Sequence, residues 1–323
     1  MAKCIGGIAT SHSPQLNTVP EVWLQRAEWD RDNPVFDFAQ MLARTDLPAD
    51  LQARLTPEAM RRHHDSCQGA IAALRQEYLD LQPDVVVIVG DDQHEMFTGD
   101  VIPAIAIYCD DSVDDIPRPL EPLHASQRAG EWAYHGPTTV TRPTHGALGR
   151  HLVGSLTRSG FDITQIRSQP AGKTIGHAFT FVQRRIMADR MAPIVPVMVN
   201  TDHTLNSPRP QRCWELGRAI RRAIDDFPGD ERVLIVGSGG LSHFKLDEPL
   251  DRSVLEALAA QDVEALAKLP EEELVLGTSE IRNWIIAAGA LENFTMSIVD
   301  YVTAYRSEGG TGCGMGFAHW RPS

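Results

Sequence analysis

The sequence lacks long apolar runs, since no stretch approaches the ~18 residues that a membrane-spanning helix needs. Its first apolar run, residues 4–9, is short and contains glycine, so we expect a strand rather than a signal peptide there. Basic residues are also few: 30 Lys and Arg stand against 43 Asp and Glu, a formal net charge of −13. This charge argues against nucleic acids and anionic membranes as partners. An anionic substrate would therefore need a local basic group.

Cysteine is equally sparse. The five cysteines are scattered, odd in number and form no CxxC pair, which makes a disulfide framework and a cysteine zinc site improbable. We therefore predict a cytoplasmic protein. A nucleotide-binding loop is also missing, because the glycines of residues 308–316 have no strand-then-helix context. We expect those glycines to permit close packing of the backbone.

Apolar runs of strand length alternate with helical patterns along the chain. The predicted strands are residues 3–9, 84–90, 102–109, 162–167, 193–200 and 232–237. The predicted helices are residues 57–81, 146–158, 179–189, 210–226, 250–268, 279–288 and 292–305. Nearly continuous apolar strands indicate a sheet covered by helices on both faces. We predict one α/β domain over residues 1–323, with a central mixed sheet flanked by helices and a helical C-terminal third.

Two irregular stretches interrupt this alternation. Residues 28–57 are rich in Asp, Arg and Pro, and residues 110–143 are polar with several aromatics and prolines. Loops of this length often act as active-site lids. For the first stretch, a surface loop without a function is an equally good interpretation.

Three histidines follow the ends of predicted strands: His12, His94 and His243. Open α/β sheets bind ligands at the carboxyl ends of their strands, so these side chains are expected to converge on one crevice. Clustered imidazoles there indicate metal binding or proton transfer. His203 also follows a strand, but a single match of this kind is weak evidence. His177 lies in GKTIGHAF, at the start of a helix.

Each histidine taken alone is most simply a hydrogen-bonded structural residue, whereas the group favours a function. Two histidines and one carboxylate would leave open positions on the metal, as in non-haem Fe(II) oxygenases. Sequence spacing does not identify the carboxylate. The candidates are Asp91, Asp92, Glu95, Asp247, Glu248 and Glu280.

The segments TSHSP, PDVVVIVGDDQH, GSGGLSH and SEIRNWIIAAGAL resemble, in this order, the class III extradiol ring-cleavage dioxygenases. This is the family of the protocatechuate 4,5-dioxygenase β subunit. The resemblance implies Fe(II) held by His12, His94 and Glu280. It makes His243 the catalytic acid/base and places His177 against the substrate or oxygen. In GDDQH the histidine lies one residue later than in the family pattern, so neighbouring Gln93 or Glu95 competes for its position.

The resemblance also implies a reaction. Both atoms of O2 would enter a catechol-type aromatic, such as a gallate-like, protocatechuate-like or methoxylated lignin-derived acid, and the ring would open beside the diol. Arg282, Lys173 and Arg142 are candidates to pair with a substrate carboxylate. Residues 28–80 are extra relative to that β subunit, and we expect them to cover the active site. We expect a homodimer only because symmetric dimers are the commonest protein oligomers.

Two other functions stay open at this point. Histidine and glutamate also suit Zn(II), so a zinc hydrolase on the same scaffold is an alternative. A binding protein that has lost catalysis is another. Aminophenols and uncharged catechols are alternative substrates.

Overall fold

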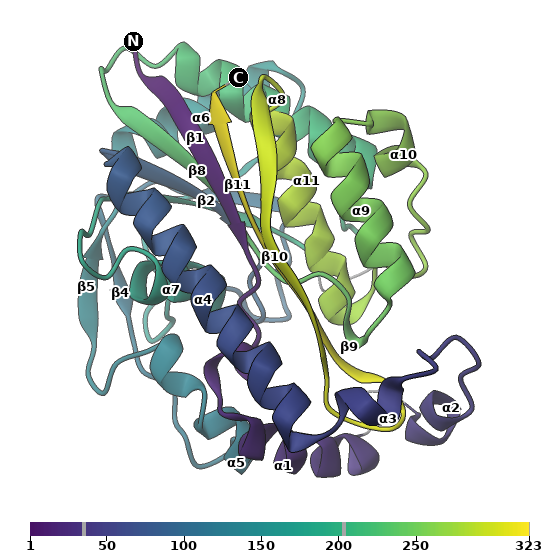
Figure 1. Ribbon diagram of the computed structural model, residues 1–323. Helices are drawn as coiled ribbons and strands as arrows, with labels where there is room; N and C mark the ends of the chain where they lie inside the picture. Colours follow the sequence, from purple (N-terminus) through teal and green to yellow (C-terminus); the bar gives the residue numbers. More distant parts are fainter. Residues whose placement is uncertain (34–36, 202–204, 323) are drawn as a thin grey trace.

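The computed structural model describes residues 1–33, 37–201 and 205–322. Its centre is a mixed sheet (Figure 1). The sheet contains β1 (Lys3–Thr10), β2 (Val85–Gly90), β3 (Ile105–Tyr108), β6 (Thr164–Ile166), β7 (Ile194–Val199), β8 (Arg232–Ser238), β9 (His243–Lys245), β10 (Phe294–Tyr305) and β11 (Thr311–Pro322). The strand order is β10-β11-β1-β8-β2-β7-β3-β6, and β9 pairs with β11. A separate hairpin joins β4 (Ser112–Asp115) to β5 (Val140–Pro143).

The middle of the sheet is parallel. β1 pairs with β8, β8 with β2 and β2 with β7, all in the parallel sense. β2 reads VVVIVG and is buried at every position, as expected for a strand covered on both faces. All six predicted strands are confirmed, some with shorter bounds. The carboxyl ends of β1, β8 and β2 therefore open onto the same edge of the sheet.

Helices cover both faces of the sheet (Figure 1). One face carries α4 (Pro57–Leu81) and α7 (His177–Arg185), with α1 (Pro20–Asp32) against α4. The other carries α6 (Gly146–Arg158), α8 (Pro210–Asp225), α9 (Glu248–Ala260) and α11 (Ile281–Ala290). Shorter elements are α2 (Phe38–Leu42), α3 (Leu51–Arg54), α5 (Ala125–Arg128), α10 (Val263–Ala267), and the 3-10 helices η1 (Pro14–Asn17), η2 (Glu131–Ala133) and η3 (Leu276–Glu280). No helix among the described residues is long and apolar enough to span a membrane.

The start of α4 illustrates how local signals set an element. Thr56 accepts a hydrogen bond from the backbone N–H of Ala59, and Pro57 occupies the first helical turn. Both features satisfy or remove backbone donors that a helix start leaves unpaired. The helix ends before Gln82, which has a left-handed backbone with φ of 44°. The predicted helix over residues 57–81 is confirmed.

The predicted α/β class is confirmed, but the helix predicted over residues 292–305 is wrong. That segment is β10, paired antiparallel with β11 from Phe294 opposite Pro322 to Tyr305 opposite Gly312. Its β-branched and aromatic residues suit a strand, and its pairing with β11 makes it a strand rather than a helix. The C-terminal third is helical only as far as Ala290.

Glycines let β11 run close to its neighbours. A Cβ on Gly314 would lie 2.0 Å from the Oδ2 atom of Asp251 in α9. The expected close packing of this glycine-rich tail is therefore confirmed, and its residues from Thr311 onward belong to a strand.

Candidate active site

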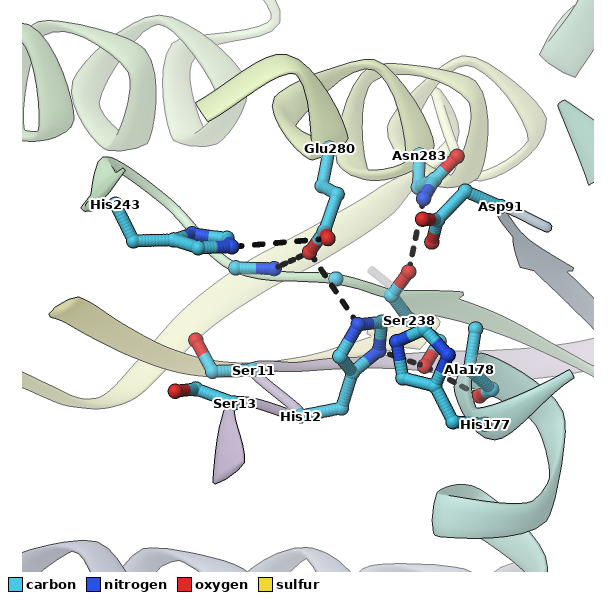
Figure 2. Close-up of polar contacts among 12 residues, drawn as sticks. Ser11, His12, Ser13, Asp91, His177, Ala178, Ser238, His243, Glu280 and Asn283 are labelled. Carbon is cyan, nitrogen blue, oxygen red and sulfur yellow. Dashed lines mark hydrogen bonds and ion pairs between the residues drawn. The ribbon is translucent and has the colours of Figure 1, made fainter. Parts of the chain in front are cut away.

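A buried cluster of His12, Asp91 and Glu280 lies at the carboxyl edge of the parallel strands (Figure 2). His12 follows β1, Asp91 follows β2, and Glu280 ends η3 where α11 begins. One ligand atom from each residue lies within 4.8 Å of the other two. The strand pairing explains the meeting, because β1 and β2 flank β8. These residue types and this spacing could hold a metal ion.

The tautomer of His12 follows from its hydrogen bonds. The Ser238 hydroxyl donates to the carbonyl of Ala178 at 2.6 Å, so its single proton is used there. Ser238 Oγ must therefore accept from His12 Nδ1, which lies 3.0 Å away. In the neutral ring His12 Nε2 then carries the lone pair, and this atom has no hydrogen-bond partner among the described residues. This is the state of an imidazole that binds a metal.

Glu280 lies between two imidazoles. Its Oε2 atom accepts a hydrogen bond of 2.6 Å from the backbone N–H of Gly240 and lies 3.4 Å from His12 Nε2. Its Oε1 atom lies 3.7 Å from His243 Nε2. Burial would raise the pKa of Glu280, but His12 and His243 hold it well below its usual range. The carboxylate is therefore charged at neutral pH.

Asp91 completes the cluster. Its Oδ1 atom is buried without a hydrogen-bond partner among the described residues, and its Oδ2 atom accepts from Gln93 Nε2 at 2.9 Å. The same Gln93 amide donates to Glu280 Oε1 at 3.2 Å, so it separates the two carboxylates. Burial and the charge of Glu280 raise the pKa of Asp91. A cation bound between them would relieve this repulsion.

His94 is not brought to this cluster. It is exposed, has a left-handed backbone with φ of 67°, and lines a separate pocket of about 20 Å³ with Asp92 and Met198. The assignment of His94 as a metal ligand stays a prediction, and the arrangement favours Asp91 in that role. His203 lies outside the described residues.

His243 faces the cluster from the start of β9. Its Nδ1 atom donates to the carbonyl of Leu241 at 2.9 Å, which leaves Nε2 directed toward Glu280 (Figure 2). Its backbone N–H donates to the Thr278 hydroxyl. Burial alone would lower the pKa of His243, but Glu280 outweighs burial and raises it to about 9. Nε2 is thus the atom that can take or give a proton.

Asp251 fixes the turn that precedes His243. Its carboxylate accepts from the backbone N–H and the hydroxyl of Ser242, both at 2.7 Å, and from the Tyr301 hydroxyl at 2.7 Å. Burial raises the pKa of Asp251 to about 7 despite these bonds. Neither Asp251 nor Tyr301 was predicted, because their contacts join distant parts of the sequence.

His177 packs against His12, with ring centroids 4.7 Å apart. Its Nδ1 atom lies 2.6 Å from Glu95 Oε1, which also accepts from the His177 backbone N–H at 2.9 Å. Burial would lower the pKa of His177, but Glu95 raises it to about 9. The Tyr134 ring meets the His177 ring edge-on at 5.6 Å. The Glu95–His177 pair therefore presents a cationic ring beside the cluster.

One cavity of about 360 Å³, within the size range of small-molecule sites, is lined by His12, His177, His243 and Glu280. Three residues of the long polar stretch 110–143 border it: Arg118, Gln127 and Tyr134. The expected lid stretch therefore contributes to the cavity wall. None of the described residues in 28–80 lines the cavity, so the predicted cover by that segment gains no support and stays a prediction.

The three basic residues considered for a substrate carboxylate lie elsewhere. Arg282 donates to the carbonyls of Pro208 and Leu274, and Arg142 pairs with Asp115. Neither they nor Lys173 lines the cavity. Sequence reasoning missed the basic residues that do line it, among them Arg26 of α1, whose side chain reaches the cavity from outside every recognised motif.

Comparison with known proteins identifies the family of the chain. Residues 48–316, more than half of the chain, match the family described as the catalytic LigB subunit of aromatic ring-opening dioxygenase. The chain is 38% identical to gallate dioxygenase of Pseudomonas putida over 102 residues, 31% of this chain and 28% of that protein. It is 29% identical to 2,3-dihydroxyphenylpropionate/2,3-dihydroxicinnamic acid 1,2-dioxygenase of Comamonas testosteroni over 54% of this chain and 47% of that protein.

A third relative, 2,3-dihydroxyphenylpropionate/2,3-dihydroxicinnamic acid 1,2-dioxygenase of Mycobacterium sp., is 27% identical over 64% of this chain and 57% of that protein. The chain thus spans about half the length, or less, of these curated relatives. The family match confirms the resemblance to extradiol dioxygenases seen in the sequence motifs. The chain belongs to the family of the catalytic LigB subunit of aromatic ring-opening dioxygenases.

Proposed function

We propose that this chain is an Fe(II)-dependent extradiol dioxygenase acting on a gallate-like or protocatechuate-like aromatic acid. The observation that carries the proposal is the convergence of two buried atoms without hydrogen-bond partners among the described residues, His12 Nε2 and Asp91 Oδ1, with the Glu280 carboxylate. Unpaired buried polar atoms are unfavourable in a folded protein, so their convergence supports the binding of a cation here. Family membership indicates the kind of chemistry.

The donor set fits a divalent metal. One imidazole and two carboxylates would hold it, with the Gln93 amide beside them. This set has one carboxylate more and one histidine fewer than the sequence motifs predict, and such oxygen-rich sites suit Fe(II) or Mn(II) better than Zn(II). The chemistry that bound Fe(II) supplies is Lewis acidity toward an aromatic diol and electron transfer from that diol to O2.

The protein residues transfer protons and position the substrate. A metal ion bound by Glu280 would weaken the hold of this carboxylate on the His243 proton, and Nε2 of the neutral ring then accepts a proton from a substrate hydroxyl, because the Nδ1 proton is committed to Leu241. The charged imidazolium is stabilised by Glu280, and the same atom returns the proton later in the reaction. His177, held by Glu95, offers a cationic hydrogen-bond donor near the reacting centre.

Oxygen uptake tests this function directly. Fe(II)-loaded protein is expected to consume one O2 per gallate or protocatechuate, without a reductant, and to place both atoms of ¹⁸O2 in the ring-opened product. His243→Gln should keep its iron and lose most turnover, as expected for a general acid–base residue worth ~10²–10⁴-fold in rate. Zn(II)-loaded protein serves as the control for the hydrolase alternative. Absence of oxygen uptake with all catechols and aminophenols would contradict the proposal.

Two neighbouring variants decide the third ligand. Asp91→Asn is expected to lose stoichiometric iron after gel filtration, whereas His94→Asn, three residues away, is expected to retain it. The opposite result would assign the ligand to His94, as the sequence motif predicts. Iron content per chain is the measurement, so the outcome does not depend on turnover.

A further inference from the structure

Three arginines line the cavity that contains the proposed metal site: Arg26, Arg118 and Arg306. Arg306 is neutralised by Asp30, to which its Nε and Nη2 atoms donate at 2.6 and 3.0 Å. Arg118 is neutralised by Glu131 through bonds of 2.8 and 2.7 Å. Both arginines are thus committed to carboxylates of the protein.

Arg26 has no such partner. Its side chain is almost fully buried, at 6% exposure, yet Nη1 has no hydrogen-bond partner among the described residues. Asp30, one turn further along α1, is already occupied by Arg306 and the Thr311 hydroxyl. The Trp29 ring lies 5.5 Å from the guanidinium carbon of Arg26.

An unpaired buried cation is unfavourable, and a nearby like charge makes it more so. Burial and the neighbouring Arg306 lower the pKa of Arg26 to about 10, so the guanidinium still carries its charge at neutral pH. The cavity wall therefore offers a positive charge to which no described carboxylate is hydrogen-bonded. An anion entering the cavity would supply the missing partner.

We propose that Arg26 binds the carboxylate of the aromatic substrate and makes the cavity select catechols that carry a carboxylate over neutral ones. A guanidinium matches a carboxylate with two parallel hydrogen bonds, which orients as well as attracts the ligand. The inference rests on the proposed function, because it takes the diol to sit at the cluster of His12, Asp91 and Glu280. Arg26 lies outside the residues matched by the family model.

Gallate and pyrogallol form a matched pair of probes, since they share three hydroxyls and differ only in the carboxylate. Their dissociation constants can be measured by calorimetry on Fe(II)-loaded protein without O2, where no turnover occurs. We expect Arg26→Met to weaken gallate binding by about 30-fold or more, the loss typical of removing one partner of a buried charge pair. Pyrogallol binding should change by less than about 3-fold, and Arg26→Lys should recover part of the gallate affinity.

Arg118→Met is the matched control from the same cavity wall, and its gallate preference over pyrogallol should persist. Equal losses of both ligands in Arg26→Met, or a selective loss of gallate in Arg118→Met instead, would overturn the inference. Thermal unfolding gives an independent readout: Arg26→Met should unfold at or above the wild-type temperature, because no described ion pair is removed. A clear fall in that temperature with equal ligand losses would identify a structural cation and also overturn it.

The two proposals fail in different ways. If wild-type protein consumes O2 with pyrogallol but Arg26→Met shows no selectivity change, only the inference about Arg26 is contradicted. If wild-type protein consumes O2 with neither diol while gallate binding still depends on Arg26, the proposed reaction is contradicted and the carboxylate site stands.

Discussion

Replacing Asp251 with asparagine should remove a pH dependence of stability that the fold builds in. The carboxyl group is buried between α9, β11 and the Ser242 turn, and its pKa is raised by burial to about 7 from an ordinary value of 3.8. The folded protein therefore keeps this proton up to about pH 7, while the unfolded chain releases it near pH 4. Each pKa unit corresponds to 1.36 kcal/mol, so the difference amounts to about 4 kcal/mol.

The sign follows from proton binding. Between pH 4 and pH 7 the folded state holds more protons than the unfolded state, so the free energy of unfolding of the wild type falls as pH rises. Asparagine does not titrate. The unfolding free energy of Asp251→Asn minus that of wild type should therefore increase by about 4 kcal/mol from pH 4 to pH 8.

Urea unfolding of metal-free protein, followed by circular dichroism across this range, measures the quantity. Most other titrating groups cancel in the difference between the two proteins. Thr56→Ala provides a control, because losing the neutral cap of α4 should cost about 1 kcal/mol at every pH. A difference for Asp251→Asn that varies by less than about 1 kcal/mol would refute the reasoning.

Two further substitutions test the packing around the site. Asp30→Asn leaves Arg306 buried without its carboxylate and should lower the free energy of unfolding by about 3–5 kcal/mol in urea titration; an unchanged midpoint would show that Gln15 and other neighbours suffice. Gly314→Ala should destabilise by about 1–3 kcal/mol, because the new methyl group meets Asp251 at 2.0 Å; a wild-type melting temperature would show that α9 can shift freely.

Local patterns were sufficient for much of the fold. The run at β2 is apolar at nearly every position, and Thr56 with Pro57 marks a helix start, so neither depends on distant residues. β10 is different, because its identity as a strand depends on pairing with β11, whose glycines carry no strand propensity of their own. A sequence window that ends before β11 cannot contain that information.

The residues of the candidate site were likewise predictable only in part. His12 and Glu280 were identifiable from motifs and do meet, whereas His94 and Asp91 differ by three residues along one turn. Which of them enters the crevice depends on the path of the chain after Gly90, including the left-handed backbone at His94. Sequence spacing does not specify that path.

Arg26 was beyond the reach of sequence analysis for a further reason. It is one of many arginines, and its importance comes from being unpaired. That state exists because Asp30 is taken by Arg306, which lies 276 positions later in the chain. Whether a buried charge has a partner depends on contacts between residues far apart in the chain.

The position of β11 has a consequence for how the protein is made. This strand lies between β1 and β10, so the first strand of the sheet acquires its antiparallel neighbour only after about three hundred residues have left the ribosome. Until then one edge of β1 has no partner strand, and the loop that carries His12 lacks its contact with Gly316. Such non-local pairing slows folding. We therefore expect nascent chains to require protection of that edge, and metal-binding capacity to appear late in synthesis.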